Sequence, residues 1–161
     1  MLIFRGVILF FCMSFLSPSA WAVSGFLKVT VSGSVESRPC KINDGKPIEV
    51  NFNDVMTTRI ENENYKQKMD YTLDCKTTGN PNMSIKFTGD NAGFDTRYLK
   101  TSVTNLGVLF KAEDNNIYMG NSFQFKYETP PALYAVLVKK SGSALPTGTF
   151  NATATMQVYY N

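Results

Sequence analysis

The sequence contains no histidine among its 161 residues. This absence excludes Ser-His-Asp and Cys-His catalytic groups, histidine-liganded zinc or haem, and the usual proton shuttle near neutral pH. An enzyme could instead use two carboxylates, as glycosidases do. However, no motif selects such a pair among the 13 acidic residues. We therefore expect a protein that is not an enzyme and that uses neither a metal ion nor a small-molecule cofactor.

Clustered positive charge is scarce as well. The net charge is only +3, and no basic run is longer than Lys139–Lys140, which we interpret as a solvated surface pair. Nucleic-acid binding needs a basic patch, so we expect no nucleic-acid partner. Hydrophobic residues make up 43% of the chain, which is typical of a folded protein, and the length suits a single domain.

The N-terminal apolar run is too short for a membrane-spanning helix, which needs about 20 residues. Arg5 precedes the apolar stretch Val7–Leu16, and Ala20-Trp21-Ala22 places small residues where a signal peptidase requires them. We predict a signal peptide over residues 1–22. Its removal takes away Cys12 and leaves Cys40 and Cys75, and an even pair in an exported domain indicates one disulfide. Two free thiols fit an exported protein less well, and a metal site would need more ligands.

Short alternating segments separated by Gly, Asn and Pro predict an all-β sandwich. The single helix candidate lies at residues 54–68, where the apolar residues form no clean stripe, so we expect no more than about one turn. The predicted strands cover residues 27–31, 48–52, 71–73, 83–87, 106–110, 123–127, 133–138 and 150–160.

Two segments near the chain ends alternate with unusual regularity. Between residues 27 and 35 the apolar side chains share one face, yet Gly33 occupies that face, where an interior strand normally packs a side chain. Residues 150–160 alternate over more than the usual strand length of about five or six residues. An apolar sheet edge of this length is an aggregation hazard. Either the N-terminal segment of the same chain or a partner must cover it.

Together these features resemble a pilin of the chaperone–usher pathway, the family that builds type 1 and P pili. The resemblance covers the chain after residue 22. It depends on Gly33 within an alternating extension ahead of Cys40, on the stretch 39–45 followed by 48–52, on Cys75, and on Gly148 combined with the penultimate aromatic residue Tyr160.

The resemblance implies an incomplete immunoglobulin-like sandwich that lacks its last strand and is completed by a donor strand from another chain. It implies a signal peptide (1–22), a donor-strand extension (23–38) and a pilin domain (39–161), with Cys40 and Cys75 bonded. The implied partners are a periplasmic chaperone, an outer-membrane usher and neighbouring pilins, and the implied location is a surface fimbrium of a Gram-negative bacterium, reached through the periplasm. The implied donor face is Leu27, Val29, Val31, Gly33 and Val35, and the implied chaperone-binding and groove-forming strand contains Gly148, Phe150, Ala152, Ala154, Met156, Val158 and Tyr160.

The expected function is that of a structural pilus subunit that contributes to adhesion and polymerises by donor-strand exchange. The short Pro39–Cys40 linker and the Tyr160–Asn161 ending are similar to those of minor P-pilus subunits. The sequence leaves a major rod subunit and a terminator open. A different interpretation is a self-contained secreted β-sandwich that binds a ligand, with the N-terminal strand completing its own sheet.

Overall fold

A computed structural model describes residues 40–75 and 82–161, so the expected signal peptide and extension lie outside the described residues. Within these residues, no helix is long and apolar enough to cross a membrane. The strands are β1 (Lys41–Ile42), β2 (Lys66–Met69), β3 (Leu73–Asp74), β4 (Asn82–Thr88), β5 (Asn91–Ala92), β6 (Asp95–Lys100), β7 (Leu106–Ala112), β8 (Asn115–Ile117), β9 (Ser122–Lys126), β10 (Leu133–Lys139) and β11 (Thr155–Tyr160).

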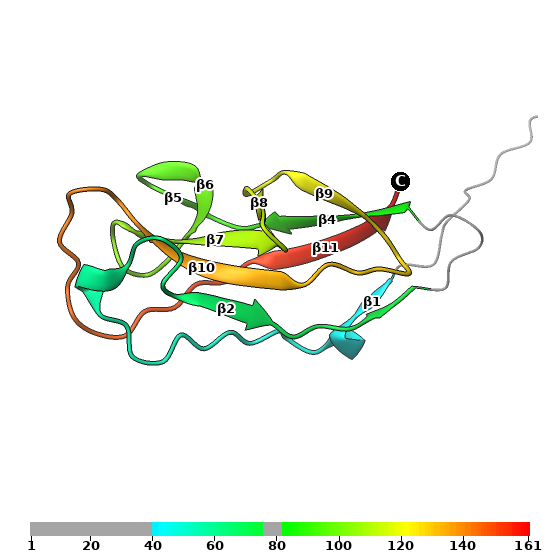
Figure 1. Cartoon of the computed structure of the whole chain (residues 1–161), viewed down its shortest axis with the longest axis horizontal. Helices are drawn as coiled ribbons and strands as arrows, with labels where there is room; N and C mark the ends of the chain where they lie inside the picture. Colours follow the sequence, from blue (N-terminus) through cyan, green and yellow to red (C-terminus); the bar gives the residue numbers. More distant parts are fainter. Residues whose placement is uncertain (1–39, 76–81) are drawn as a thin grey trace, which may run out of the picture. The chain divides into compact units, whose positions relative to one another are not determined.

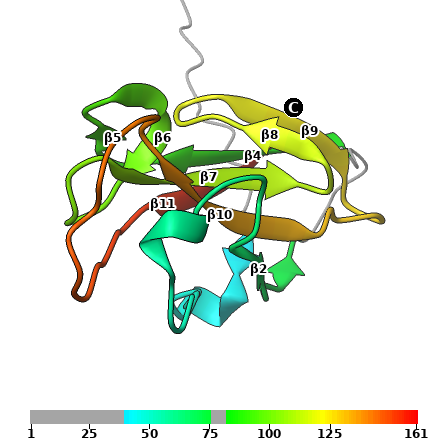
Figure 2. The same cartoon turned by 60° about the vertical axis from the view of Figure 1, so that its left-hand side comes forward.

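The strands form two main antiparallel sheets (Figures 1 and 2). The larger sheet has the order β2-β10-β7-β6-β5, with β8 also paired to β7, and the smaller has the order β11-β4-β9. A separate short pair joins β1 to β3. The all-β sandwich expected from the strand pattern is confirmed.

The hydrophobic core lies between the two sheets and is centred on β4. Ile85 and Phe87 of β4 are buried, and the Phe87 ring stacks on Phe110 of β7 with a centroid separation of 4.0 Å. Since β4 and β7 belong to opposite sheets, this stack ties the two layers together. Alternation places every second side chain of each strand in this layer.

Most of the predicted strands that fall on described residues are confirmed, but three regions differ, and β5, β6 and β8 are additional strands. Residues 54–68 hold a single 3₁₀ turn (η2, Thr57–Arg59) followed by β2, which hydrophobic periodicity did not reveal because Lys-Gln-Lys-Met contains one apolar residue. Residues 48–52 show the expected alternation of burial, yet they form no strand, and the strand expected from residue 150 begins only at Thr155. The functional site accounts for the missing strand at 48–52 and for the late start of β11.

The disulfide between Cys40 and Cys75 is confirmed. It closes a loop with a sequence separation of 35 residues, which stabilises the fold by about 4 kcal/mol in the chain-entropy model. The adjacent β1 pairs with β3, Lys41 opposite Asp74. The beginning of the domain is therefore held to its body by a covalent bond and a short ladder.

A buried charge fixes the turn before β2. The Lys111 ammonium, which is almost inaccessible to solvent, donates a hydrogen bond to Glu63 Oε1, and Lys66 Nζ lies 3.5 Å from Glu63 Oε2. The hydrogen bond from Lys111 holds the pKa of Glu63 below its ordinary value of 4.5. The lowered pKa means that the folded state prefers ionised Glu63, so this interaction stabilises the fold above about pH 4.5 and is lost as the pH falls through the folded-state pKa.

We expect Glu63→Gln to lower the free energy of unfolding by about 1–2 kcal/mol at pH 7, because Lys111 loses its charged acceptor. At pH 3 the two proteins should differ less than at pH 7, since a falling pH protonates Glu63 and removes the charged acceptor of Lys111. Urea-induced unfolding of identically prepared proteins at both pH values measures the difference. Glu61→Gln, on the exposed side of the same turn, is the control, and an equal loss at both pH values would contradict the prediction.

Candidate functional site

An open groove of about 710 Å³ runs along the domain between two segments that lie far apart in the sequence. One wall comes from residues 47–52 and the other from residues 150–156. In Figure 1 the first wall is drawn as a plain coil leading away from β1, and in Figure 2 the orange loop after β10 leads to the second. The groove is therefore formed by the two regions in which the expected strands are missing or shortened.

The walls present apolar side chains at alternate positions. On the first wall Ile48, Val50 and Phe52 are half-buried, whereas Glu49 and Asn51 between them are exposed. The same period of two marks an extended chain whose one face points into the groove. On the second wall the half-buried side chains are Phe150, Ala154 and Met156, and Ala152 on the same face is exposed.

The floor of the groove is the hydrophobic core itself. The ring of Phe52 lies 6.0 Å from that of Phe150, so the two walls meet at this point. Elsewhere the groove reaches buried side chains of both sheets, among them the stacked Phe87 and Phe110. The other floor residues are Met69, Leu99, Val108 and Ala135.

Both walls present backbone edges with unused hydrogen-bonding capacity. Among residues 40–75 and 82–161, β11 pairs only with β4 and is the edge of its sheet. Within the same residues, no hydrogen bond joins the backbone of 47–52 to another backbone group. This explains why 48–52 are extended but form no strand, since a ladder needs a partner. Ahead of β11, the backbone of Asn151 bonds to Ser102 and not to β4. The arrangement can accept one additional strand, which would pair with β11 and fill the groove with alternate side chains.

The expected C-terminal site residues are brought to one face, with differences along its length. Phe150, Ala152, Ala154 and Met156 line the groove. Val158 and Tyr160 continue that face, opposite Ile85 and Met83 of β4. The expected donor residues Leu27, Val29, Val31, Gly33 and Val35 lie outside the described residues.

Two details of the C-terminal segment concern its ends. Gly148 has φ +136°, a conformation that favours glycine, at the turn leading into the segment. At the other end the Tyr160 hydroxyl is buried and has no hydrogen-bond partner within the described part of the chain. A buried hydroxyl without a partner is costly, so this end of the strand favours contact with a further polar group.

Sequence reasoning missed Gly89, which allows the second wall to approach β4. A Cβ atom at this position would lie 2.9 Å from Leu99 Cδ1 and 3.1 Å from the carbonyl oxygen of Thr153. Thr153 belongs to the groove wall, so a side chain at residue 89 would push the wall outward. Glycine occurs just after strands for several structural reasons, so the sequence alone does not indicate that Gly89 makes room for the groove wall.

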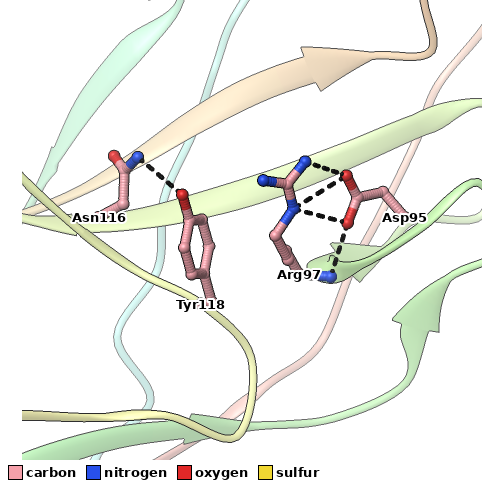
Figure 3. Close-up of polar contacts among 4 residues, drawn as sticks. All are labelled: Asp95, Arg97, Asn116 and Tyr118. Carbon is pink, nitrogen blue, oxygen red and sulfur yellow. Dashed lines mark hydrogen bonds and ion pairs between the residues drawn. The ribbon is translucent and has the colours of Figure 1, made fainter.

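A polar cluster on β6 and β8 lies away from the groove (Figure 3). The Arg97 guanidinium donates three hydrogen bonds to the Asp95 carboxylate, one to Oδ1 at 3.0 Å and two to Oδ2 at 2.6 and 3.1 Å. It also lies 5.4 Å from the centroid of the Tyr118 ring. The Arg97 hydrogen bonds hold the pKa of Asp95 below its ordinary value. Because Arg97 and Asp95 satisfy each other, we interpret this cluster as a surface contact that stiffens the sheet edge. Across the described residues, no three acidic or cysteine side chains gather as a metal site would require.

Comparison with known proteins agrees with this geometry. The family model "Fimbrial protein" matches residues 29–161. Two relatives from Escherichia coli strain K12 are the uncharacterized fimbrial-like proteins YfcR, 32% identical over 76% of this chain and 73% of that protein, and YfcQ, 30% identical over 82% and 86%. The solved P pilus adaptor subunit PapF shares 23% identity over 80% of this chain and all of its own, with a TM-score of 0.58.

The comparisons and the two incomplete sheets agree on an immunoglobulin-like pilin sandwich, and the interpretation as a self-contained ligand-binding sandwich is not favoured. Fimbrial relatives imply a surface fimbrium of a Gram-negative bacterium. The chain belongs to the fimbrial protein family, and it is a chaperone–usher pilin, a structural subunit of a pilus.

Proposed function

We propose that the groove beside β11 accepts a donor β-strand from a neighbouring pilin, and that residues 23–38 of this chain serve as the donor strand for another. The observation that carries this proposal is the open groove between two unpaired edges whose floor is the hydrophobic core. An inserted strand gains backbone hydrogen bonds from β11, and its alternate side chains replace water against the floor. Subunits joined in this head-to-tail manner form an open filament, because a heterologous contact that does not close continues.

The donor face of this chain consists of Leu27, Val29, Val31, Gly33 and Val35. Its apolar side chains recur at every second residue, so in an extended strand all of them can face the apolar floor of one groove. Gly33 is the exception, and we propose that it faces the shallowest part of the neighbour's groove, where a side chain would not fit.

An unfilled groove of this kind exposes core side chains, so the subunit needs a temporary partner before assembly. We propose that a periplasmic chaperone lends a strand to the groove after export, and that the outer-membrane usher hands the subunit to the growing pilus. Residues 1–22 would direct the export and 39–161 would form the pilin domain.

We also propose that this chain is a minor subunit of the adaptor kind. One of the solved structures to which it is similar is described as the P pilus adaptor subunit PapF. The Pro39–Cys40 linker and the Tyr160–Asn161 ending of this chain resemble those of minor P-pilus subunits. A rod subunit would be expected in large amounts in purified pili, and an adaptor in few copies.

The central test is co-purification from periplasm with the chaperone of the same pilus system. We expect a one-to-one complex that releases the chaperone when a synthetic peptide with the sequence of the donating neighbour's N-terminal extension is added. A peptide of residues 23–38 should in the same way release the chaperone from the pilin that receives this chain's extension. A peptide carrying Gly33→Leu should release at least tenfold less, because the bulky side chain meets the shallow part of the groove. A chain that folds alone as a stable monomer, without a chaperone, would contradict the proposal.

The groove itself can be tested on its first wall. Val50→Arg should reduce recovery of the chaperone complex at least fivefold, because a charge would enter the apolar groove. Glu49→Arg is the matched control, since the neighbouring side chain is exposed and does not line the groove. Quantitative immunoblots of periplasmic extracts compare the two variants, and equal recovery would count against this groove.

The end of β11 gives a separate prediction. Tyr160→Ala should weaken capture by the chaperone, seen as a lower periplasmic level and a smaller complex fraction. Tyr159→Ala, on the outer face of the same strand, should leave capture within twofold of the original protein. Unchanged capture of Tyr160→Ala would mean that the C-terminal signature is not used.

A further inference from the structure

A second hollow of about 710 Å³ lies at the end of the domain that carries the disulfide. It is lined by the end of β2, the segment leading into β3, Glu113 after β7, and the 127–132 loop. Two tyrosines, Tyr71 and Tyr127, and two prolines, Pro130 and Pro131, give it an apolar interior. It shares only Met69 with the lining of the groove and is therefore a separate feature of the surface.

Hydrogen bonds hold the hollow in shape. The Tyr71 hydroxyl donates to the carbonyl oxygen of Pro131 at 2.7 Å, and Glu113 Oε1 accepts from the backbone N–H of Ala132 at 2.6 Å. Burial and the nearby Glu113 charge raise the pKa of Tyr71 to about 12, so this phenol stays neutral. The hollow is therefore a formed surface whose loop is fixed at both ends.

The charge at the hollow is predominantly negative. Asp70 and Glu113 contribute carboxylates, and Lys68 contributes one ammonium group that lies 3.5 Å from Asp70 Oδ1. The Asp70 side chain is 90% exposed and can therefore form an ion pair with a further cation. Aromatic rings beside carboxylates suit a lysine or arginine side chain, which combines cation–π contact with charge-assisted hydrogen bonds.

The hollow lies beside the point where the extension joins the domain. The Cys75 N–H donates to the Tyr127 hydroxyl at 3.5 Å, and Cys75 is bonded to Cys40. Leu73, which lines the hollow, pairs with Ile42 of β1. Residues 23–38 end just ahead of Cys40, so a neighbour that holds them must stand close to this end of the domain.

Sheet geometry indicates which end of that neighbour faces the hollow. The β11-β4-β9 sheet is antiparallel, and a donor strand that continues this pattern runs opposite to β11. Its last residues then leave the groove near the start of β11, beside the loop that follows β10. In this chain that end exposes Arg59, Lys100 and Lys140, together with the carboxylates of Glu61 and Asp90. A neighbour that is a second copy of this chain would bring these basic side chains to the hollow.

We propose that the hollow receives a lysine or arginine side chain from the loop end of the pilin whose groove holds residues 23–38 of this chain. The inference rests on donor-strand exchange as the proposed function and adds a second contact to it. The contact adds a second point of attachment beside the donor strand and so fixes the angle between consecutive subunits.

Site-specific photo-crosslinking in cells that assemble pili tests the contact. p-Benzoylphenylalanine at Val29 identifies the neighbour that holds the donor strand, and at Tyr127 it reports on the hollow. We expect the Tyr127 crosslink to join the same neighbour, at a loop that carries lysine or arginine, while a control at Tyr118 does not. A crosslink from Tyr127 to a different protein, or none, overturns the proposal. A missing crosslink from Val29 would instead overturn donor-strand exchange.

A charge reversal separates a specific contact from mere proximity. Asp70→Lys should lower the yield of the Tyr127 crosslink at least threefold and leave the Val29 crosslink within twofold. Asp74→Lys is the matched control, since Asp74 is exposed on β3 and does not line the hollow. An unchanged Tyr127 yield with Asp70→Lys would overturn the role of the hollow while leaving donor-strand exchange intact.

Discussion

The fold depends on a hydrophobic core that the described strands leave partly uncovered. The smaller sheet ends at β11, and the core beside this edge lies open to the groove. A sandwich is stable when each sheet covers the apolar face of the other. Here Phe87 and Phe110 stack between the sheets and are also reached from the groove. Under the proposed donor-strand exchange, the interaction that completes the core is intermolecular, so folding and assembly are coupled.

This constraint explains why local sequence patterns and observed strands agree in some places and differ in others. Residues 83–87 and 133–138 are strands as expected, because their partners belong to the same chain. Residues 48–52 alternate equally well and pack their apolar side chains correctly, yet they form no strand. Periodicity reports the face that a side chain prefers, whereas a strand also needs a hydrogen-bonded neighbour.

The candidate site was predictable in part. The C-terminal alternation and the chain's resemblance to pilins marked the second wall from the sequence. The first wall, the floor and Gly89 could not be assigned in this way, because they come from segments that only the tertiary fold brings together. Of the strands that the sequence did not predict, β2 and β6 were missed for a related reason, since their polar residues belong to strands only through pairing with β10 and β7. The acidic hollow likewise combines residues from three separate segments.

The disulfide has a mechanical consequence for a subunit in a filament under tension. A pull on the extension enters the domain at Cys40, next to a wall that has no backbone ladder within the described residues to resist peeling. The covalent bond to Cys75 diverts that load past residues 47–52 and delivers it to the body of the sandwich. The weakly held wall can therefore stay open enough to admit a donor strand during assembly and still carry no force afterwards.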